Sequence, residues 1–289
     1  HRDLHSFPTR RSSDLRRPRL GGLDRGLLRA TSFMTLSLRL LLLKDLRLFR
    51  RDPVQWSQFL ILFGLLCLYF LNVRRFNYDV QYAGSVNTIS FLNLSVVGLL
   101  LAIFNTRFIF PTISLEGRRF WILGLLPLRR ETILWGKFLF ASLAFMLPCC
   151  ALILLSDLML GVHGVIVLSH QFTCALLSVG LSGIAVGLGA KLPDFREQSP
   201  SRIAAGFGGT LNLVVSALFI AIIVAATALP CHFYSALNIY RPCMPAVATV
   251  ASYFSAWLLT GTAVSVVLTI AATVIPMRMG FKAFRELEF

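Results

Sequence analysis

The feature that most constrains this chain is a series of long apolar stretches separated by short polar segments rich in Lys and Arg. A helix needs about 20 consecutive apolar residues to cross the roughly 30 Å hydrocarbon core of a bilayer. Hydrophobic residues make up 56% of the chain and charged residues only 14%, whereas a soluble domain carries about 25% charged residues. The sequence therefore predicts an all-α, polytopic membrane helical bundle with about six transmembrane helices.

Each apolar stretch predicts one span. The predicted spans cover residues 54–73, 89–106, 138–155, 165–188, 211–229 and 255–275. The stretch that contains the last span is longer than one crossing needs, so the segment 232–254 is a candidate for a re-entrant or interfacial helix. Between Met34 and Asp52, leucines fall on one helical face and basic residues on another. We expect an amphipathic interfacial helix there, ahead of the first span.

The first 32 residues are predicted to lie outside the membrane domain, which occupies residues 33–289. Residues His5–Leu15 read HSFPTRRSSDL and resemble the in-frame translation of a sequencing-library adapter. The alternative is a natural, basic and disordered tail, and residues 16–32 read as a linker. A segment of that origin is not part of the native fold. On the adapter interpretation, the reading frame began upstream and this chain is the C-terminal part of a longer protein.

The basic residues indicate an orientation in the membrane. The formal net charge is +15, but no basic stripe is interleaved with exposed aromatics as nucleic-acid binding would require. Lys and Arg gather before the first span, after the second and fourth spans, and in the C-terminal tail. The positive-inside rule places such segments in the cytoplasm. The sequence thus predicts two cytoplasmic termini, contact with membrane lipid, and no nucleic-acid partner.

The sequence carries no motif for catalysis, cofactor binding or metal binding. It lacks the Gly-x-x-x-x-Gly-Lys-Ser/Thr phosphate loop of ATP-hydrolysing proteins. His163 and His170 have no Glu at metal-site spacing, and Ser178 and Ser182 read as helix-packing residues. We therefore predict no enzyme activity, no catalytic residues, no cofactor and no metal. Ion-coupled transport would need ionisable residues at mid-membrane, and Asp157 lies only at the outer end of the third span.

Two cysteines share one predicted external segment. Cys231 and Cys243 both follow the fifth span, and an oxidising compartment would allow a disulfide between them. Spacing alone does not distinguish a bonded pair from two free thiols, so both alternatives stay open.

One predicted cytoplasmic segment mixes clustered charge with large aromatic residues. Between the second and third spans, Arg118 and Arg119 precede Phe120 and Trp121. A run of charged residues usually forms a solvated surface, but apolar residues within the run are typical of an amphipathic helix that binds a partner. One candidate partner is the membrane surface, where Arg meets anionic lipid headgroups and Trp anchors at the interface. The other candidate is a soluble protein.

Several motifs together resemble a bacterial family of ABC exporter permeases related to the type-2 class, over about residues 40–289. The motifs are FRRDPVQWSQ at 49–58, ISLEGRRFWILGLLPL at 113–128, ILWGKF at 133–138 and PDFREQSPSRIAAGFGGTLNL at 193–213. Members of that family are longer and have a preceding half that also contains spans. The resemblance implies a permease subunit of the bacterial inner (cytoplasmic) membrane. Its partners would be a separate ATP-binding cassette ATPase and either a second permease half or a homodimer partner.

The resemblance also implies where the ATPase would bind. In type-2 permeases the helix before the first span and the loop between the second and third spans contact that subunit. The implied ATPase-coupling residues are Glu116, Arg118, Arg119, Phe120 and Trp121, and the secondary cytoplasmic contacts are Arg47, Arg50, Arg51, Asp194 and Arg196. The alternative function is that of an ion-coupled secondary transporter or another polytopic membrane protein.

Overall fold

The computed structural model describes residues 22–32, 34–51, 53, 56–57, 60, 63–64, 66–68, 83–117, 130–197, 199–240 and 246–286. Within these residues, all the regular secondary structure is helical. The helices in chain order are α1 (Gly22–Ala30), α2 (Leu36–Arg51), α4 (Ala83–Phe104), the π-helix η2 (Asn105–Ile109), α5 (Thr112–Glu116), α7 (Arg130–Leu160), α8 (Gly164–Lys191), α9 (Pro200–Ala205), α10 (Phe207–Tyr240) and α11 (Ala246–Glu286).

Five of the described helical segments are long and apolar enough to cross a membrane. They are Thr88–Glu116, Glu131–Leu160, Gly164–Lys191, Phe207–Pro230 and Ala256–Glu286. They correspond in order to the second to sixth predicted spans, and they confirm the prediction of an all-α polytopic membrane protein. The first predicted span, 54–73, falls mostly outside the described residues. Two of its described residues, Phe63 and Leu66, pack in the core, where the Phe63 ring lies 5.4 Å from that of Phe104.

Several helices extend beyond the apolar stretches that predicted them. α10 continues to Tyr240, and α11 runs without interruption from Ala246. The described parts of 232–254 therefore belong to these two helices. A helix satisfies its own backbone hydrogen bonds, so it does not need to end where the apolar residues end. We expected a linker at 16–32, but its residues Gly22–Ala30 form α1.

The predicted amphipathic helix between Met34 and Asp52 is present as α2. Its buried residues include Leu41, Leu42 and Leu43, while Arg50 and Arg51 in its last turn are exposed. The helix packs against α7, and Gly136 of α7 lies beneath the Leu41 side chain. α2 is therefore fastened to the bundle by its apolar face, with basic residues on its outer side.

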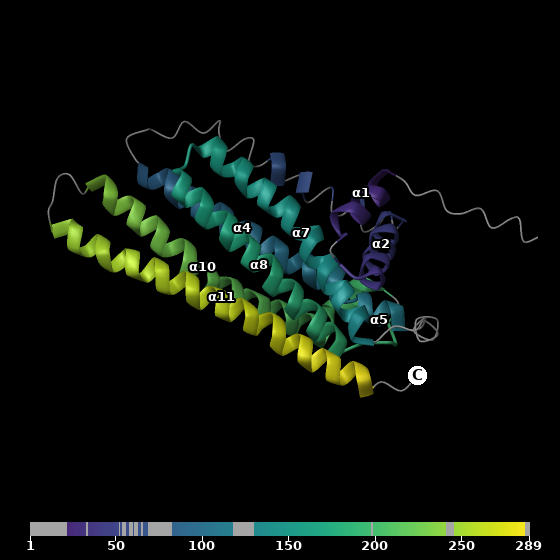
Figure 1. The fold of residues 1–289 in the computed structure, drawn as a ribbon. Coiled ribbons are helices and arrows are strands. Elements are labelled where there is room, and N and C mark those ends of the chain that lie inside the picture. The colour runs from purple at the N-terminus through teal and green to yellow at the C-terminus, as the bar shows by residue number, and fades with distance from the viewer. Residues whose placement is uncertain are drawn as a thin grey trace, which may run out of the picture.

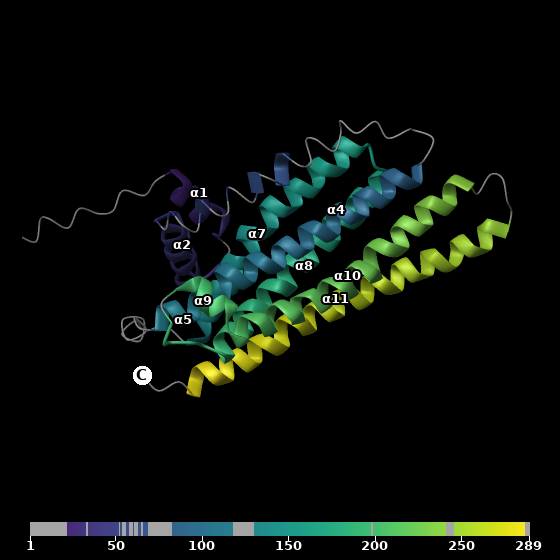
Figure 2. The same ribbon diagram turned by 180° about the vertical axis from the view of Figure 1, so that it is seen from behind.

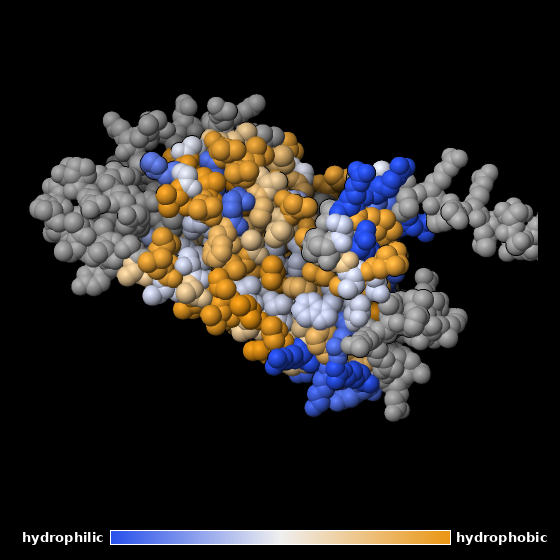
Figure 3. Space-filling model, in the orientation of Figure 1, coloured by the Kyte–Doolittle hydropathy of each residue, from blue (hydrophilic) through white to orange (hydrophobic). Residues whose placement is uncertain are grey.

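The long helices α4, α7, α8, α10 and α11 lie side by side in one elongated bundle (Figures 1 and 2). The short helices α1, α2, α5 and α9 gather at one end, where α11 also reaches its C-terminal end. We call this the charged end. In Figure 3 the largest hydrophilic patches of the molecule lie around α1, α2 and the end of α11, while hydrophobic residues cover most of the visible bundle. An apolar surface along the length of a bundle fits a lipid environment.

Helix α8 is the centre of the bundle. In its apolar part 72% of residues are buried inside the protein, compared with 22% for α11. Its glycines permit very close packing: a Cβ at Gly183 would lie 2.7 Å from the Thr273 Cα, and one at Gly187 would lie 2.3 Å from the Pro276 carbonyl carbon. Small residues let membrane helices approach closely enough for van der Waals contact between their backbones. The position of α11 is thus set by the glycine face of α8.

Candidate functional site

An ion-pair cluster joins three helices at the charged end. Glu116, the last residue of α5, pairs through Oε1 with Lys44 Nζ of α2 at 2.9 Å. Its Oε2 pairs with Lys137 Nζ of α7, also at 2.9 Å. The Lys137 side chain is 5% exposed and that of Glu116 is 15% exposed. Because removing one member of a buried pair leaves an uncompensated charge, these three residues hold α2, α5 and α7 in one arrangement.

A second set of contacts docks α1 on α2. Arg47 pairs with the buried Asp24 of α1 at 2.8 Å, and Arg39 donates a hydrogen bond to the Leu28 carbonyl oxygen. Arg47, one of the predicted secondary contacts, is therefore engaged within the chain. The neighbouring Arg50 and Arg51 are exposed on the outer side of α2. These two arginines are available to a partner, whereas Arg47 positions the helix that carries them.

The connection between α8 and α9 packs onto the end of α5. The backbone N–H of Asp194 donates to Ser114 Oγ of α5 at 3.0 Å. A Cβ at Gly117 would lie 2.1 Å from the Phe195 ring, so only glycine admits the ring at this point. Asp194 Oδ1 accepts the backbone N–H of Arg196 at 2.9 Å, which shapes the turn and leaves the Arg196 side chain exposed. The predicted contacts Asp194 and Arg196 thus lie beside α5.

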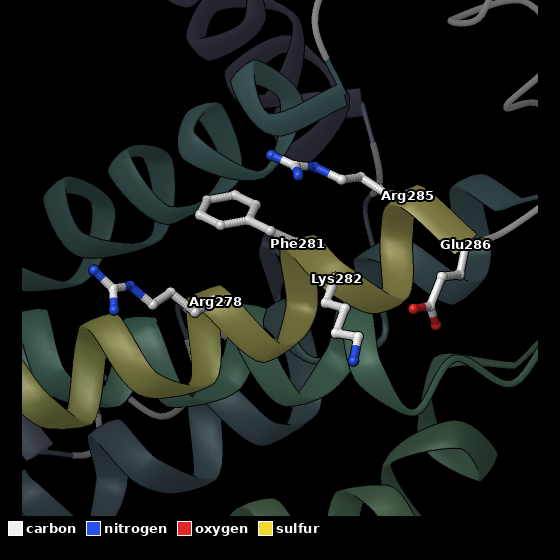
Figure 4. A pocket seen from close by; sticks show the side chains of 5 residues that line it. All are labelled: Arg278, Phe281, Lys282, Arg285 and Glu286. Carbon is white, nitrogen blue, oxygen red and sulfur yellow. The ribbon is translucent and has the colours of Figure 1, made fainter.

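The end of α11 completes this surface. A pocket of about 450 Å³ is lined by Arg278, Phe281, Lys282, Arg285 and Glu286, and Figure 4 shows these side chains projecting from the last turns of the helix. Arg285 forms an ion pair with Glu131 at the start of α7, and the Phe281 ring lies 6.1 Å from that of Trp135. The last turns of α11 are thereby tied to the same helix, α7, that carries Lys137.

Most of the implied coupling segment lies outside the described residues. Arg118, Arg119, Phe120 and Trp121 follow directly after Gly117, the last described residue before that gap. The structure therefore describes α5 and Gly117, which precede these four residues in the chain, but not the four residues themselves. Cys243 also falls outside the described residues, so the disulfide with Cys231 stays a prediction. Cys231 itself belongs to the helical segment α10, where the sequence had indicated an external connection.

Polar side chains are buried between the spans near the π-helix. Asn212 of α10 donates to Thr106 Oγ1 at 2.7 Å, and Ser182 of α8 lies 3.5 Å from Asn105 Oδ1. All four residues are buried, and Asn212 Oδ1 has no hydrogen-bond partner among the described residues. π-Helical turns often occur at functional sites. We expected Ser182 to be a packing residue, and the structure adds that it faces a polar seam between α8, η2 and α10.

Sequence reasoning missed a second buried polar cluster, at the end of the bundle opposite the charged end. Asp157 of α7 and His170 of α8 approach to 2.9 Å, and His170 contacts His232 of α10 at 3.0 Å. We expected His170 to be a polar residue in the bundle that takes no part in a metal site. A signal was available, because Asp157 and His170 both lie within two turns of the short connection between α7 and α8 and so are at similar depth.

Comparison with known proteins identifies the family. A family model described as "Putative ATP-binding cassette" matches residues 3–289. No curated protein and no solved structure gives a significant match. The family match agrees with the resemblance found in the sequence motifs, and five of the described helices are long and apolar enough to cross a membrane. Because the match covers nearly the whole chain, this multi-pass membrane protein belongs to the ATP-binding cassette transporter family that this model describes.

Proposed function

We propose that this chain is the membrane-spanning permease subunit of an ABC-type exporter in a bacterial inner membrane. A separate ATPase subunit hydrolyses ATP and pushes on the charged end, which lies in the cytoplasm. The bundle, together with a second permease half or a homodimer partner, then changes between inward-open and outward-open states by rigid-body movement. Family membership and the five described membrane-length helices support this function.

The observation that carries the proposal is the cluster of Glu116, Lys44 and Lys137. It makes α2, α5 and α7 one mechanical unit, and the segment 118–121 continues directly from that unit. A movement of Arg118–Trp121 would be transmitted to the membrane-spanning helix α7 through the buried ion pair between Glu116 and Lys137. Packed side chains, ion pairs and rigid helices are the kind of physical connection that carries coupling between distant sites.

The proposed contact with the ATPase is made by Arg118, Arg119, Phe120 and Trp121, with Glu116 anchoring the segment from inside the chain. Arg and Trp are among the residues that dominate binding energy at protein interfaces. Arg50, Arg51 and Arg196 are exposed on the adjoining elements α2 and the α8–α9 connection, and we assign them secondary contacts. Cationic side chains there would also meet anionic lipid headgroups at the membrane surface.

The experiment compares Arg119→Ala/Trp121→Ala with the wild type in co-purification of the ATPase. Truncating hot-spot residues costs about 2 kcal/mol or more each, so association should weaken by more than about tenfold. Membrane insertion should stay normal. The matched control is Arg202→Ala/Phe207→Ala, which removes an exposed arginine and an exposed aromatic elsewhere at the charged end. Unchanged association in the first variant, with reduced membrane stability, would assign the segment to lipid anchoring instead.

Ion-coupled secondary transport is the second candidate function. The buried contact between Asp157 and His170 favours it, because ionisable residues buried at membrane depth often mark ion pathways. The two candidates differ in their dependence on ATP. Transport in reconstituted vesicles that stops when ATP hydrolysis is blocked supports the exporter, whereas transport that continues on an ion gradient alone supports the second candidate.

A further inference from the structure

Four buried side chains from four helices form one continuous chain of polar contacts. Ser90 of α4 donates to Asp157 Oδ1 of α7 at 2.7 Å. Asp157 Oδ2 lies 2.9 Å from His170 Nδ1 of α8. His170 Nε2 lies 3.0 Å from His232 Nε2 of α10. The other ring nitrogen of His232, Nδ1, has no hydrogen-bond partner among the described residues, although it is buried.

This chain of contacts is costly to place inside a membrane protein. Ser90 and Asp157 are each 1% exposed, His170 is 0% exposed and His232 is 9% exposed. Burying ionisable groups between helices carries a desolvation penalty, and such groups within transmembrane segments are rare and usually functional. The Phe91 ring also packs here, at 87° to the His232 ring and with 5.5 Å between the centroids. An apolar set of residues would pack the same space without that penalty.

The same heavy-atom geometry accommodates two proton counts. In the first, the carboxylate accepts hydrogen bonds from Ser90 and from His170 Nδ1–H, His170 Nε2 accepts from His232 Nε2–H, and His232 Nδ1 carries a lone pair. In the second, His170 is an imidazolium that donates to both Asp157 and His232 Nε2, and His232 carries its hydrogen on Nδ1. The heavy atoms keep their partners in both states, and only hydrogens change place.

We propose that Asp157, His170 and His232 form a proton-binding site, in which the added proton is held at His232 Nδ1 and the bound charge resides on His170. One proton taken up from the aqueous phase adds to the lone pair of His232 Nδ1. The hydrogen on His232 Nε2 transfers to His170 Nε2, so His232 stays neutral in its other tautomer. His170 becomes an imidazolium beside the Asp157 carboxylate, and the reverse transfer releases one proton.

The charged and polar groups around the site favour proton transfer from His232 to His170. α7 contributes the carboxylate of Asp157, α8 contributes His170, α10 contributes His232, and α4 contributes the uncharged Ser90 and Phe91. The carboxylate contacts His170 and not His232, so a positive charge is favoured on His170. A proton needs no space between packed helices, unlike an organic ligand. The inference does not depend on whether transport is driven by ATP or by an ion gradient.

Nitrogen-15 NMR of the histidine-labelled protein in lipid bilayers tests the proposal. Spectra are recorded from about pH 8 to about pH 5, the range in which histidine charge ordinarily changes. On acidification, both ring nitrogens of His170 should become protonated, and the hydrogen of His232 should move from Nε2 to Nδ1. Tautomers and charges that stay constant for both residues would overturn the proposal. So would an imidazolium at His232 beside a neutral His170.

Two variants test whether the Asp157 carboxylate stabilises the imidazolium of His170. Asp157→Asn removes the carboxylate but keeps the side-chain volume, and the imidazolium signal of His170 should then be lost at the acid end of the range. The matched control is His163→Gln, because His163 is an exposed histidine in the connection between α7 and α8. This control should keep both the imidazolium of His170 and the tautomer change of His232. An imidazolium signal that persists in Asp157→Asn, or disappears in His163→Gln, contradicts the assignment.

Discussion

Lys137 of α7 and Glu116 of α5 form an ion pair at 2.9 Å in which the lysine side chain is almost completely buried. The same glutamate pairs with Lys44, whose side chain is 38% exposed. The two lysines are therefore unequal partners: Lys137 depends on Glu116 to compensate its buried charge, while Lys44 is partly solvated. Replacing each lysine in turn should therefore lower the stability of the protein by different amounts.

We expect Lys137→Met to destabilise the protein by about 1–3 kcal/mol, because Glu116 would keep only its partly solvated partner. Lys44→Met is the matched control, and its cost should stay below about 1 kcal/mol, as for exposed ion pairs. Denaturant or thermal unfolding of the purified protein in detergent measures both. Equal losses for the two variants would contradict the view that the α5–α7 pair dominates the cluster.

The close approach of α8 and α11 predicts the effect of a single methyl group. Gly187→Ala would place a Cβ 2.3 Å from the carbonyl carbon of Pro276, and overpacking of this kind costs about 1–3 kcal/mol. The unfolding temperature in detergent should fall. Gly164→Ala, at the start of the same helix, places its Cβ in open space and should leave that temperature unchanged. If the first substitution is also neutral, α11 does not rest on the glycine face of α8.

The proposed orientation predicts opposite labelling of the two ends of the bundle. In a cysteine-free background, a cysteine replacing the exposed His163 should react with a membrane-impermeant reagent added outside intact cells. A cysteine replacing the exposed Ser201, on α9 at the charged end, should react only after the membrane is permeabilised. The positive-inside rule supplies the reason. Equal labelling of both positions from outside would rule out this orientation.

The polar seam at the π-helix predicts a small energetic effect. Asn212→Leu removes the hydrogen bond to Thr106 and also removes Asn212 Oδ1, which has no partner among the described residues. Hydrogen bonds between membrane helices contribute about 0.6 kcal/mol on average, so we expect a loss of stability below about 1 kcal/mol in unfolding measurements. A loss of several kcal/mol would show that Asn212 is a structural residue of the bundle. Leu213→Ala, on the exposed side of α10, is the control.

The resemblance found in the sequence motifs placed Glu116 in the candidate site but did not predict its contacts within the chain. The motif at 113–128 contains Glu116, and the charge pattern placed α2 and the segment after the second span on the same side. Neither pattern indicated that Glu116 would turn inward to Lys44, 72 residues away in the chain. The reason is that a charge run specifies exposure on average, whereas the direction of one side chain depends on which helix packs beside it.

The sequence alone determined the fold class, the second to sixth spans and the charged end. A single stretch of about 20 apolar residues crosses lipid as a helix, because the helix is the structure that pairs all of its backbone groups within one segment. Only the tertiary structure decided which polar residues meet. His170 and His232 are 62 residues apart, and their contact depends on the rotation and depth of α8 and α10. Those quantities follow from how closely the backbones pack at glycines and small residues, which composition and periodicity do not encode.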